Sequence, residues 1–149
     1  MSIEERFWAK VDKSGECWIW TAARYGSGYG AFRVSPEIGT RAAHRCAWEL
    51  SRGEIPPGKF LDHMCHNRPC VNPAHLRVVS NKENGENRAP MESRGVAWRK
   101  DRQKWRARVT HNCKEYFAGY FDSHEDAAKA ARALRNELFT HNDLDRTLA

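Results

Sequence analysis

The sequence predicts an α+β chain of two small domains, residues 1–89 and 90–149. The length of 149 residues suits two such domains, and a small polar run around Pro90 is the best candidate boundary. Before it, strand-like segments flank a loop rich in histidine and cysteine. After it, three strand-like segments precede one alanine-rich segment, which predicts a three-stranded antiparallel sheet packed on one helix.

The first half of the N-terminal domain is expected to contain two strands and a helix. Residues 17–34, CWIWTAARYGSGYGAFRV, favour two strands around a glycine-rich turn, because aromatic and β-branched residues lie on both sides of Gly26–Gly28. Residues 41–50, RAAHRCAWEL, predict a short helix, which Gly53 and the following proline pair would end.

The second half of this domain is expected to run strand, loop, strand, helix. Residues 59–65 and 75–80 have strand-like composition, and the loop HNRPCVNPA lies between them. Ser80 has the spacing of a capping box with the glutamate three residues later, so a polar helix is expected over residues 81–89.

The C-terminal domain is expected to pair its strands and cover one face with a helix. The predicted strands are residues 95–99, 105–110 and 115–121, and Ser123 can cap the helix that follows. That helix has a narrow face of small residues suited to lying on a sheet. The face comprises Ala127, Ala128, Ala130, Ala131, Ala133 and Leu134.

The absence of long apolar runs in the sequence limits the protein class. No run approaches the roughly 18 residues of a membrane-spanning helix. The first ten residues, MSIEERFWAK, lack the apolar stretch of a secretory signal. We therefore expect a cytoplasmic protein with no membrane partner. In that compartment the five cysteines are expected as metal ligands or free thiols rather than as disulfides.

The chain is basic, with a formal net charge of +6 and a pI of about 9.2. Such a balance favours polyanionic partners, with nucleic acid ahead of membrane surfaces. The positive charge is concentrated between Arg94 and Lys114, where eight basic side chains are opposed by Asp101 alone and are interleaved with Trp98 and Trp105. This stretch is the candidate nucleic-acid surface.

The loop between residues 65 and 75 has the spacing of a zinc site. Cys65, Cys70 and His75 are separated by gaps close to those between ligands in structural zinc sites. Such a site needs four ligands, so one must come from elsewhere. Cys17 and Cys46 are the two candidates. Cys17 opens the first predicted strand, whereas Cys46 lies in a predicted helix among apolar residues.

A second set of side chains flanks this loop and differs in chemistry. Asp62 offers a carboxylate and Asn84 a carbonyl oxygen, and these ligands suit Mg²⁺ or Mn²⁺ better than zinc. His63, held nearby but off the metal, could take a proton from water. Arg45 is a candidate phosphate clamp, and an ordinary salt bridge is the alternative for it.

The segment HMCHNRPCVNPAHL, followed by NKENGENR, resembles the ββα-metal (His-Me finger, or HNH) endonucleases. It is most similar to His-Cys box homing nucleases and phage HNH proteins, over roughly residues 15–88. The resemblance implies a zinc-stabilised ββα-metal domain that hydrolyses phosphodiester bonds in double-stranded DNA. Such an enzyme would be a homing or nicking endonuclease of a phage or mobile element, acting in the bacterial host cell.

The resemblance also implies roles for individual residues. His63 would be the general base, and Asn84 and Asp62 would hold the catalytic Mg²⁺ or Mn²⁺. One structural zinc per chain would be bound by four side chains, with Cys17 as the upstream cysteine. These are Cys17, Cys65, Cys70 and His75.

The C-terminal domain resembles the plant ethylene-responsive-factor (Apetala-type) DNA-binding domain over about residues 93–139. The matching pieces are Gly95-Val96, WRARV at 105–109, GYF at 119–121 and the EDAAKAA helix. The resemblance implies a sheet lying in the major groove, with arginines and tryptophans on its exposed face. The expected DNA contacts are Arg94, Arg99, Lys100, Arg102, Lys104, Trp105, Arg106 and Arg108.

Strand alternation allows such a face. Arg106 and Arg108 would point to one side, and Ala107 and Val109 would point to the other, toward the helix. The sequence thus predicts an HNH-family DNA endonuclease that is a monomer or a homodimer. The alternative is a non-catalytic, zinc-stabilised, sequence-specific DNA-binding regulator.

Overall fold

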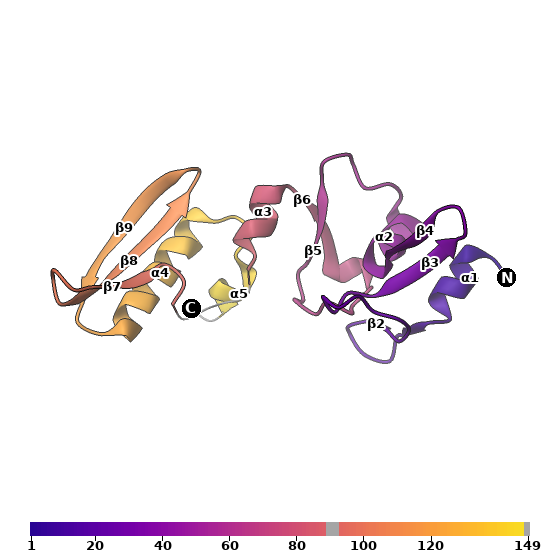
Figure 1. The fold of residues 1–149 in the computed structure, drawn as a ribbon, viewed down its shortest axis with the longest axis horizontal. Helices are drawn as coiled ribbons and strands as arrows, with labels where there is room; N and C mark the ends of the chain where they lie inside the picture. Colours follow the sequence, from indigo (N-terminus) through magenta and orange to yellow (C-terminus); the bar gives the residue numbers. More distant parts are fainter. Residues whose placement is uncertain (89–92, 148–149) are drawn as a thin grey trace. The chain divides into compact units, whose positions relative to one another are not determined.

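Every described strand pairs with an antiparallel neighbour, and the strands form four small sheets. The computed structural model describes residues 1–88 and 93–147 (Figure 1). The chain divides into two units, Met1–Asn81 and Lys82–Ala149, and each is described by itself. The division falls before the predicted boundary after residue 89; Pro90, on which that prediction rested, lies outside the described residues.

The N-terminal unit begins with a helix that the pattern analysis did not predict, α1 (Ile3–Trp8). Its start is a capping box, in which the Ser2 hydroxyl accepts from the Glu5 N–H and the Glu5 carboxylate accepts from the Ser2 N–H. The helix sends Phe7 into the core, where the side chain is fully buried.

Two strands flank the glycine-rich turn as predicted, but they do not pair with each other. β2 (Ile19–Trp20) pairs with β1 (Val11–Asp12), and β3 (Ala31–Ser35) pairs with β4 (Gly39–Ala42). The turn itself is closed by hydrogen bonds from the Gly28 N–H to the Tyr25 carbonyl and from the Tyr25 N–H to the Tyr29 carbonyl.

Aromatic side chains fill the core of this unit. The Phe7 ring lies 5.1 Å from the rings of both Trp20 and Phe32, measured between centroids. Gly30 lies against them, and a Cβ added there would come within 2.7 Å of the Trp20 ring and 2.8 Å of the Ala43 Cβ. Only glycine leaves room for that approach. Ala43 begins the helix α2 (Ala43–Arg52), which covers this core.

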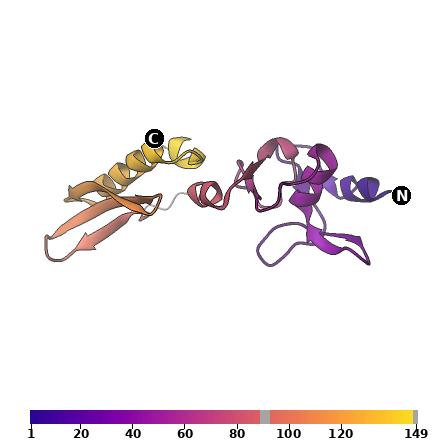
Figure 2. The same ribbon diagram turned by 90° about the horizontal axis from the view of Figure 1, so that it is seen from above.

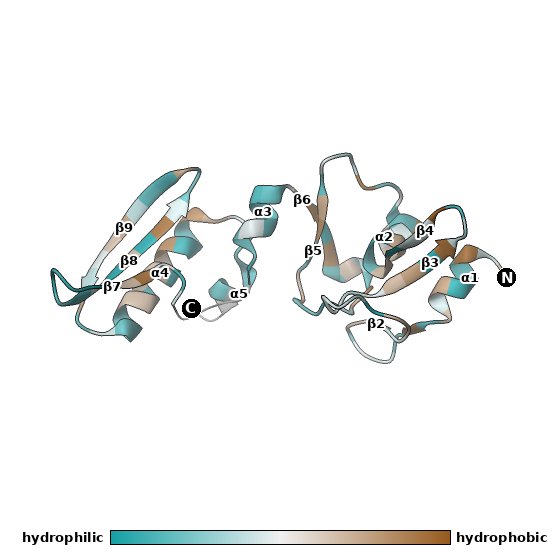
Figure 3. Cartoon of the chain, in the orientation of Figure 1, coloured by the Kyte–Doolittle hydropathy of each residue, from teal (hydrophilic) through white to brown (hydrophobic). Residues whose placement is uncertain are grey.

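The candidate site is built on a hairpin. β5 (Phe60–His63) pairs with β6 (Leu76–Val79), so that Asp62 faces Arg77 and His63 faces Leu76 across the ladder. The connecting loop ends in a single 3₁₀ turn, η1 (Pro73–His75). The hairpin leads into α3 (Asn81–Glu86), which is shorter than the predicted helix 81–89 and mostly hydrophilic (Figure 3).

The C-terminal unit contains the three predicted strands and the predicted helix. β7 (Val96–Arg99), β8 (Lys104–His111) and β9 (Lys114–Phe121) form one antiparallel sheet in that order. α4 (His124–Leu138) begins after Ser123, whose hydroxyl accepts from the Asp126 N–H at 3.0 Å. The helix lies along one face of the sheet (Figure 2). Ala107, Ala127 and Ala131 form the buried contact between helix and sheet.

Two polar side chains, Glu86 and Arg135, fasten the ends of this unit. The Glu86 carboxylate accepts from the Thr140 N–H at 3.0 Å and from the Thr140 hydroxyl at 3.1 Å, so α3 is tied to the segment after α4. The buried Arg135 of α4 donates to Asp145 of α5 (Asp143–Thr147) at 2.5 Å and to the Arg94 carbonyl at 2.7 Å. None of the described helices has the length and apolarity needed to cross a bilayer.

Candidate metal centre and active site

Three cysteines and one histidine converge beside the β5–β6 hairpin. The Sγ atoms of Cys17, Cys65 and Cys70 and a ring nitrogen of His75 all lie within 4.8 Å of one another. The His75 Nδ1 is 3.5 Å from the Cys17 Sγ and 3.6 Å from the Cys70 Sγ. Three thiolates and an imidazole at such separations can surround one tetrahedral metal ion, and this is a donor set of structural zinc sites.

Backbone pairing brings the distant Cys17 to the loop. The Trp20 N–H donates to the Pro69 carbonyl at 2.9 Å, and the Val71 N–H donates to the Trp18 carbonyl at 2.8 Å. These bonds align the segment that follows Cys17 with the loop around Cys70. This pairing therefore brings Cys17 to the cluster although it lies far from the loop in the sequence.

Asn72 fixes the other end of the loop. Its amide nitrogen donates to the Glu16 carbonyl at 2.9 Å, and its Oδ1 accepts from the Ala74 N–H at 3.0 Å. The second bond caps the 3₁₀ turn that ends at His75. One buried side chain thus links the residue before Cys17 to the turn that presents His75.

Cys46, the alternative fourth ligand, lies elsewhere. Its side chain is buried in the aromatic core with Phe32 and Ala47. Burial raises the pKa of the Cys46 thiol, as expected for a small apolar packing residue. Burial also raises the pKa of Cys65, and raises that of Cys70 to about 12.

His63 ends β5 and is almost completely buried. Its Nε2 lies 2.9 Å from the backbone carbonyl of Cys70. A carbonyl can only accept, so this contact assigns the ring proton to Nε2 and leaves the lone pair on Nδ1. Burial lowers the pKa of His63, although the Cys70 carbonyl and the Asp62 carboxylate act in the opposite direction. Its neutral form is therefore favoured.

Asp62 is engaged with its cross-strand neighbour. Its Oδ2 accepts from the Nε of Arg77 at 2.9 Å and lies 2.9 Å from another nitrogen of the same guanidinium. The carboxylate is buried, and a buried carboxylate requires such a partner. The structure therefore gives Asp62 an ion-pair role in the hairpin, which the sequence analysis did not predict.

Two aromatic side chains beside His63 were missed by the sequence analysis. The His44 ring lies 4.9 Å from the His63 ring, and the Tyr29 ring lies 5.2 Å from His44 and 5.7 Å from His63. The guanidinium of Arg68 lies 5.7 Å from the centre of the Tyr29 ring. No spacing rule connects these residues, because they come from a turn, a helix and a strand that meet only in the fold.

Arg45, the predicted phosphate clamp, lines a surface depression with Arg41 and Glu49. The carboxylate of Glu49 is held by both terminal nitrogens of Arg41 at 2.8 Å. His44, the residue before Arg45, is the α2 side chain in contact with His63.

Asn84, the predicted metal ligand, is half-buried on α3. The helix α3 is anchored within the C-terminal unit through Glu86.

The open face of the C-terminal sheet carries positive charge. Arg106 lies between Ala97 and Tyr120 in the strand register, on the face opposite Ala107. Other basic groups on or near this face have local partners. Arg108 pairs with Glu115, Lys104 with Asp122, and Arg99 with Asp101, while Arg102 lies 4.7 Å from the Tyr120 ring centre; Lys100 is exposed in the β7–β8 turn.

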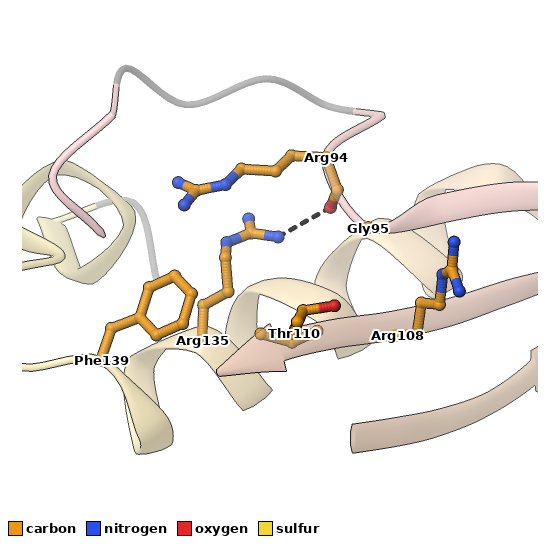
Figure 4. Close-up of a pocket in the computed structure, with 7 residues that line it drawn as sticks. Arg94, Gly95, Arg108, Thr110, Arg135 and Phe139 are labelled. Carbon is orange, nitrogen blue, oxygen red and sulfur yellow. Dashed lines mark hydrogen bonds between the residues drawn. The ribbon is translucent and has the colours of Figure 1, made fainter. Parts of the chain in front are cut away.

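Two expected DNA contacts lie on the helix side instead. Trp105 alternates with Ala107 and packs on the alanine core, with its ring 4.9 Å from that of His124. Arg94 lines a pocket with Arg135 and Phe139, and its guanidinium lies 5.4 Å from the Phe139 ring centre (Figure 4). Both side chains pack against or near α4, and a DNA contact by either of them stays a prediction.

Part of the chain is similar to known proteins. Residues 41–86 match the family model described as HNH endonuclease. The chain is 35% identical over 80 residues to Protein 3.8 of Escherichia phage T7, covering 49% of this chain and 64% of that protein. It is 42% identical over 40 residues to the gene 5.3 protein of Enterobacteria phage T3, covering 27% of this chain and 40% of that protein.

A viral relative extends the similarity. An HNH endonuclease of Acanthamoeba polyphaga mimivirus is 24% identical over 113 residues, covering 75% of this chain and 60% of that protein. The chain thus spans 40 to 64% of the length of these three relatives. No solved structure matches it. The matched residues 41–86 include His44, His63 and three of the four clustered metal-site residues.

Proposed function

We propose that this protein is a divalent-metal-dependent DNA endonuclease that hydrolyses phosphodiester bonds in double-stranded DNA. The observation that carries the proposal is His63, buried in the HNH segment with its Nε2 hydrogen-bonded to the Cys70 carbonyl. We assign it to the homing or nicking type, encoded by a phage or mobile element and acting in the host cytoplasm as a monomer or homodimer.

Two metals with separate tasks complete the assignment. Cys17, Cys65, Cys70 and His75 would hold one structural zinc, because their donor set and separations suit a tetrahedral site. Asn84 and Asp62 would hold Mg²⁺ or Mn²⁺, with Asp62 exchanging part of its contact to Arg77 for the ion. When bound, that ion supplies neutralisation of charge on the phosphate and on the leaving 3′ oxygen.

His63 would act as the general base. Its Nδ1 lone pair would accept a proton from the water that attacks phosphorus, while the bond from phosphorus to the 3′ oxygen breaks. The Cys70 carbonyl holds the ring proton on Nε2 and so keeps Nδ1 in the basic state. General-base catalysis of this kind contributes typically about 10²–10⁴ in rate. Arg45 would contribute a positive charge near the phosphate backbone.

The C-terminal unit would position the nuclease on DNA. We assign it to the ethylene-responsive-factor type, an assignment supported by its three-stranded antiparallel sheet, and we assign its open face, with Arg106 and Arg108, to the major groove. Arginine can bond guanine bidentately, which gives sequence preference. The remaining basic side chains would contact phosphates and make binding sensitive to salt.

Plasmid cleavage tests the proposal. We expect purified protein to convert supercoiled DNA to nicked or linear DNA with Mg²⁺ and to leave it intact with EDTA. The variant His63→Ala should bind DNA but fail to cut it, and His141→Ala, which removes a histidine of the other unit, should cut normally. Binding without Mg²⁺-dependent cleavage by the wild type would contradict the proposal and favour a DNA-binding regulator.

A further inference from the structure

His44 stands beside the base of the proposed nuclease and has no role in the mechanism above. It lies on α2, and its ring is 4.9 Å from that of His63. The Tyr29 ring packs at 5.2 Å from His44 and 5.7 Å from His63, so one aromatic side chain borders both imidazoles. A histidine held this close to a general base is placed to meet the same phosphate.

The charge state of His44 is fixed by its surroundings. Burial lowers its pKa to about 3, and the charge that His63 carries when protonated and the charge of Arg45 act in the same direction. The ring is therefore neutral over the whole physiological range. A neutral imidazole carries one N–H and one lone pair, so its contribution to a reaction depends on which nitrogen carries the proton.

The two ring nitrogens of His44 differ in environment. Nδ1 is buried and makes no hydrogen bond to any described residue, whereas Nε2 is not among the buried atoms that lack a partner. A buried N–H without an acceptor is rarer in proteins than a buried acceptor without a donor. The proton is therefore favoured on Nε2, which makes His44 a neutral hydrogen-bond donor through that nitrogen.

His44 and His63 thus have complementary tasks set by their contacts. His63 has its N–H engaged by the Cys70 carbonyl and offers a lone pair on Nδ1. His44 has its lone pair on the buried side and offers an N–H. We propose that His44 is a second catalytic residue, which donates a hydrogen bond from Nε2 to a non-bridging oxygen of the phosphate that His63 helps water to attack.

This inference rests on the proposed nuclease activity and adds a residue to it. The hydrogen bond needs no proton transfer and no change of charge on His44. Its benefit is electrostatic, because negative charge grows on the non-bridging oxygens in the transition state. Removing one such preorganised donor typically lowers a rate by about 10²–10³. A neutral donor also avoids placing a second cation beside His63, which would weaken His63 as a base.

Two variants separate donation from packing. His44→Phe keeps an aromatic ring against Tyr29 and His63 but removes the N–H. His44→Gln keeps a neutral N–H donor. We expect the single-turnover cleavage rate of His44→Phe to be lower than that of wild type by about 10²–10³. Its zinc content, melting temperature and DNA affinity should be unchanged. The cleavage rate of His44→Gln should be at least tenfold higher than that of His44→Phe. Wild-type cleavage by His44→Phe would overturn the inference, as would equal rates for the two variants.

A spectroscopic measurement distinguishes failure of this inference from failure of the nuclease assignment. ¹⁵N NMR of the histidine rings in the full chain should show His44 neutral from pH 5 to 8 with its proton on Nε2. Adding duplex DNA with Ca²⁺, to prevent cleavage, should shift the Nε2 resonance. Lack of cleavage by the wild type would overturn the nuclease assignment and with it the catalytic role of His44, whereas the shift of the Nε2 resonance would still report its hydrogen bond to the phosphate. A proton on Nδ1, or an Nε2 signal unmoved by bound DNA, would overturn the role of His44.

Discussion

The Nε2 atom of His63 lies 2.9 Å from the backbone carbonyl of Cys70, so the proposed base is held by the loop that carries the metal cluster. Cys70 contributes its thiol to the cluster and its carbonyl to His63. A metal ion bound there would restrain this carbonyl, and the carbonyl fixes both the orientation and the tautomer of His63. Under the proposed function, metal binding and catalysis would be coupled through this one residue.

The first prediction concerns the fourth ligand. Cys17→Ser should lose zinc and unfold at lower temperature, because three ligands cannot close a structural tetrahedral site. Cys46→Ala should keep one zinc per chain, since Cys46 packs in the aromatic core rather than in the cluster. Elemental analysis and thermal unfolding check both variants. Zinc retained by Cys17→Ser, or lost by Cys46→Ala, would contradict the assignment.

The second prediction concerns the packing of Gly30. Gly30→Ala should destabilise the N-terminal unit by about 1–3 kcal/mol, the usual range for overpacking, because the new Cβ would lie 2.7 Å from the Trp20 ring. Gly26→Ala is the matched control, since an added Cβ there meets nothing within 4 Å. Denaturant unfolding measures both variants. Equal midpoints for the two would show that the contact around Gly30 is looser than described.

The third prediction concerns the acid stability of the C-terminal unit. Burial acts to raise the pKa of Asp145, but the hydrogen bond and charge of Arg135 outweigh it and hold the pKa below the ordinary value of 3.8. Because the folded-state pKa is lowered, this contribution is fully present above pH 3.8 and is lost as the pH falls through the lowered value.

The variant Asp145→Asn isolates that effect. Its melting temperature should lie well below wild type at pH 7, because Arg135 would keep a buried charge without its partner. The difference should shrink as the pH falls below 3.8, where wild type also loses the carboxylate charge. Asp122→Asn, at an exposed aspartate, is the control. A difference that is constant with pH would contradict the ion pair as its source.

The fourth prediction concerns the open face of the sheet. Arg106→Ala should weaken DNA binding and, if Arg106 meets a phosphate, reduce the slope of log K against log salt by about 0.9. Lys129→Ala removes the same charge from the helix side, where Lys129 pairs with Glu125, and should leave affinity unchanged. Fluorescence anisotropy at several salt concentrations measures both. An equal loss of DNA affinity in the two variants would show that the total charge of the protein, rather than the open face of the sheet, determines binding.

Local patterns were sufficient to predict most elements near the site. Cysteine spacing placed Cys65, Cys70 and His75 in one group, and strand alternation placed Arg106 opposite Ala107. The α1 helix was missed although Ser2 and Glu5 have capping-box spacing. That signal was present in the sequence, but the segment is too short for a periodic apolar pattern.

Long-range contacts were beyond the reach of those patterns. Whether Cys17 or Cys46 joins the cluster depends on the pairing of Trp18–Trp20 with the loop, which no local spacing encodes. The approach of His44 and Tyr29 to His63 likewise depends on how α2 packs. The packing of Trp105 on the alanine core follows from strand alternation, because Trp105 lies two residues from the buried Ala107 on the same strand.

The single-turnover cleavage rate of His63→Ala, with protein in excess over duplex DNA and Mg²⁺ present, tests the central claim most directly. Loss of the imidazole that the Cys70 carbonyl orients should lower the rate by about 10²–10⁴ relative to wild type, with zinc content and DNA affinity unchanged. A rate equal to that of wild type under those conditions would show that His63 is not the base.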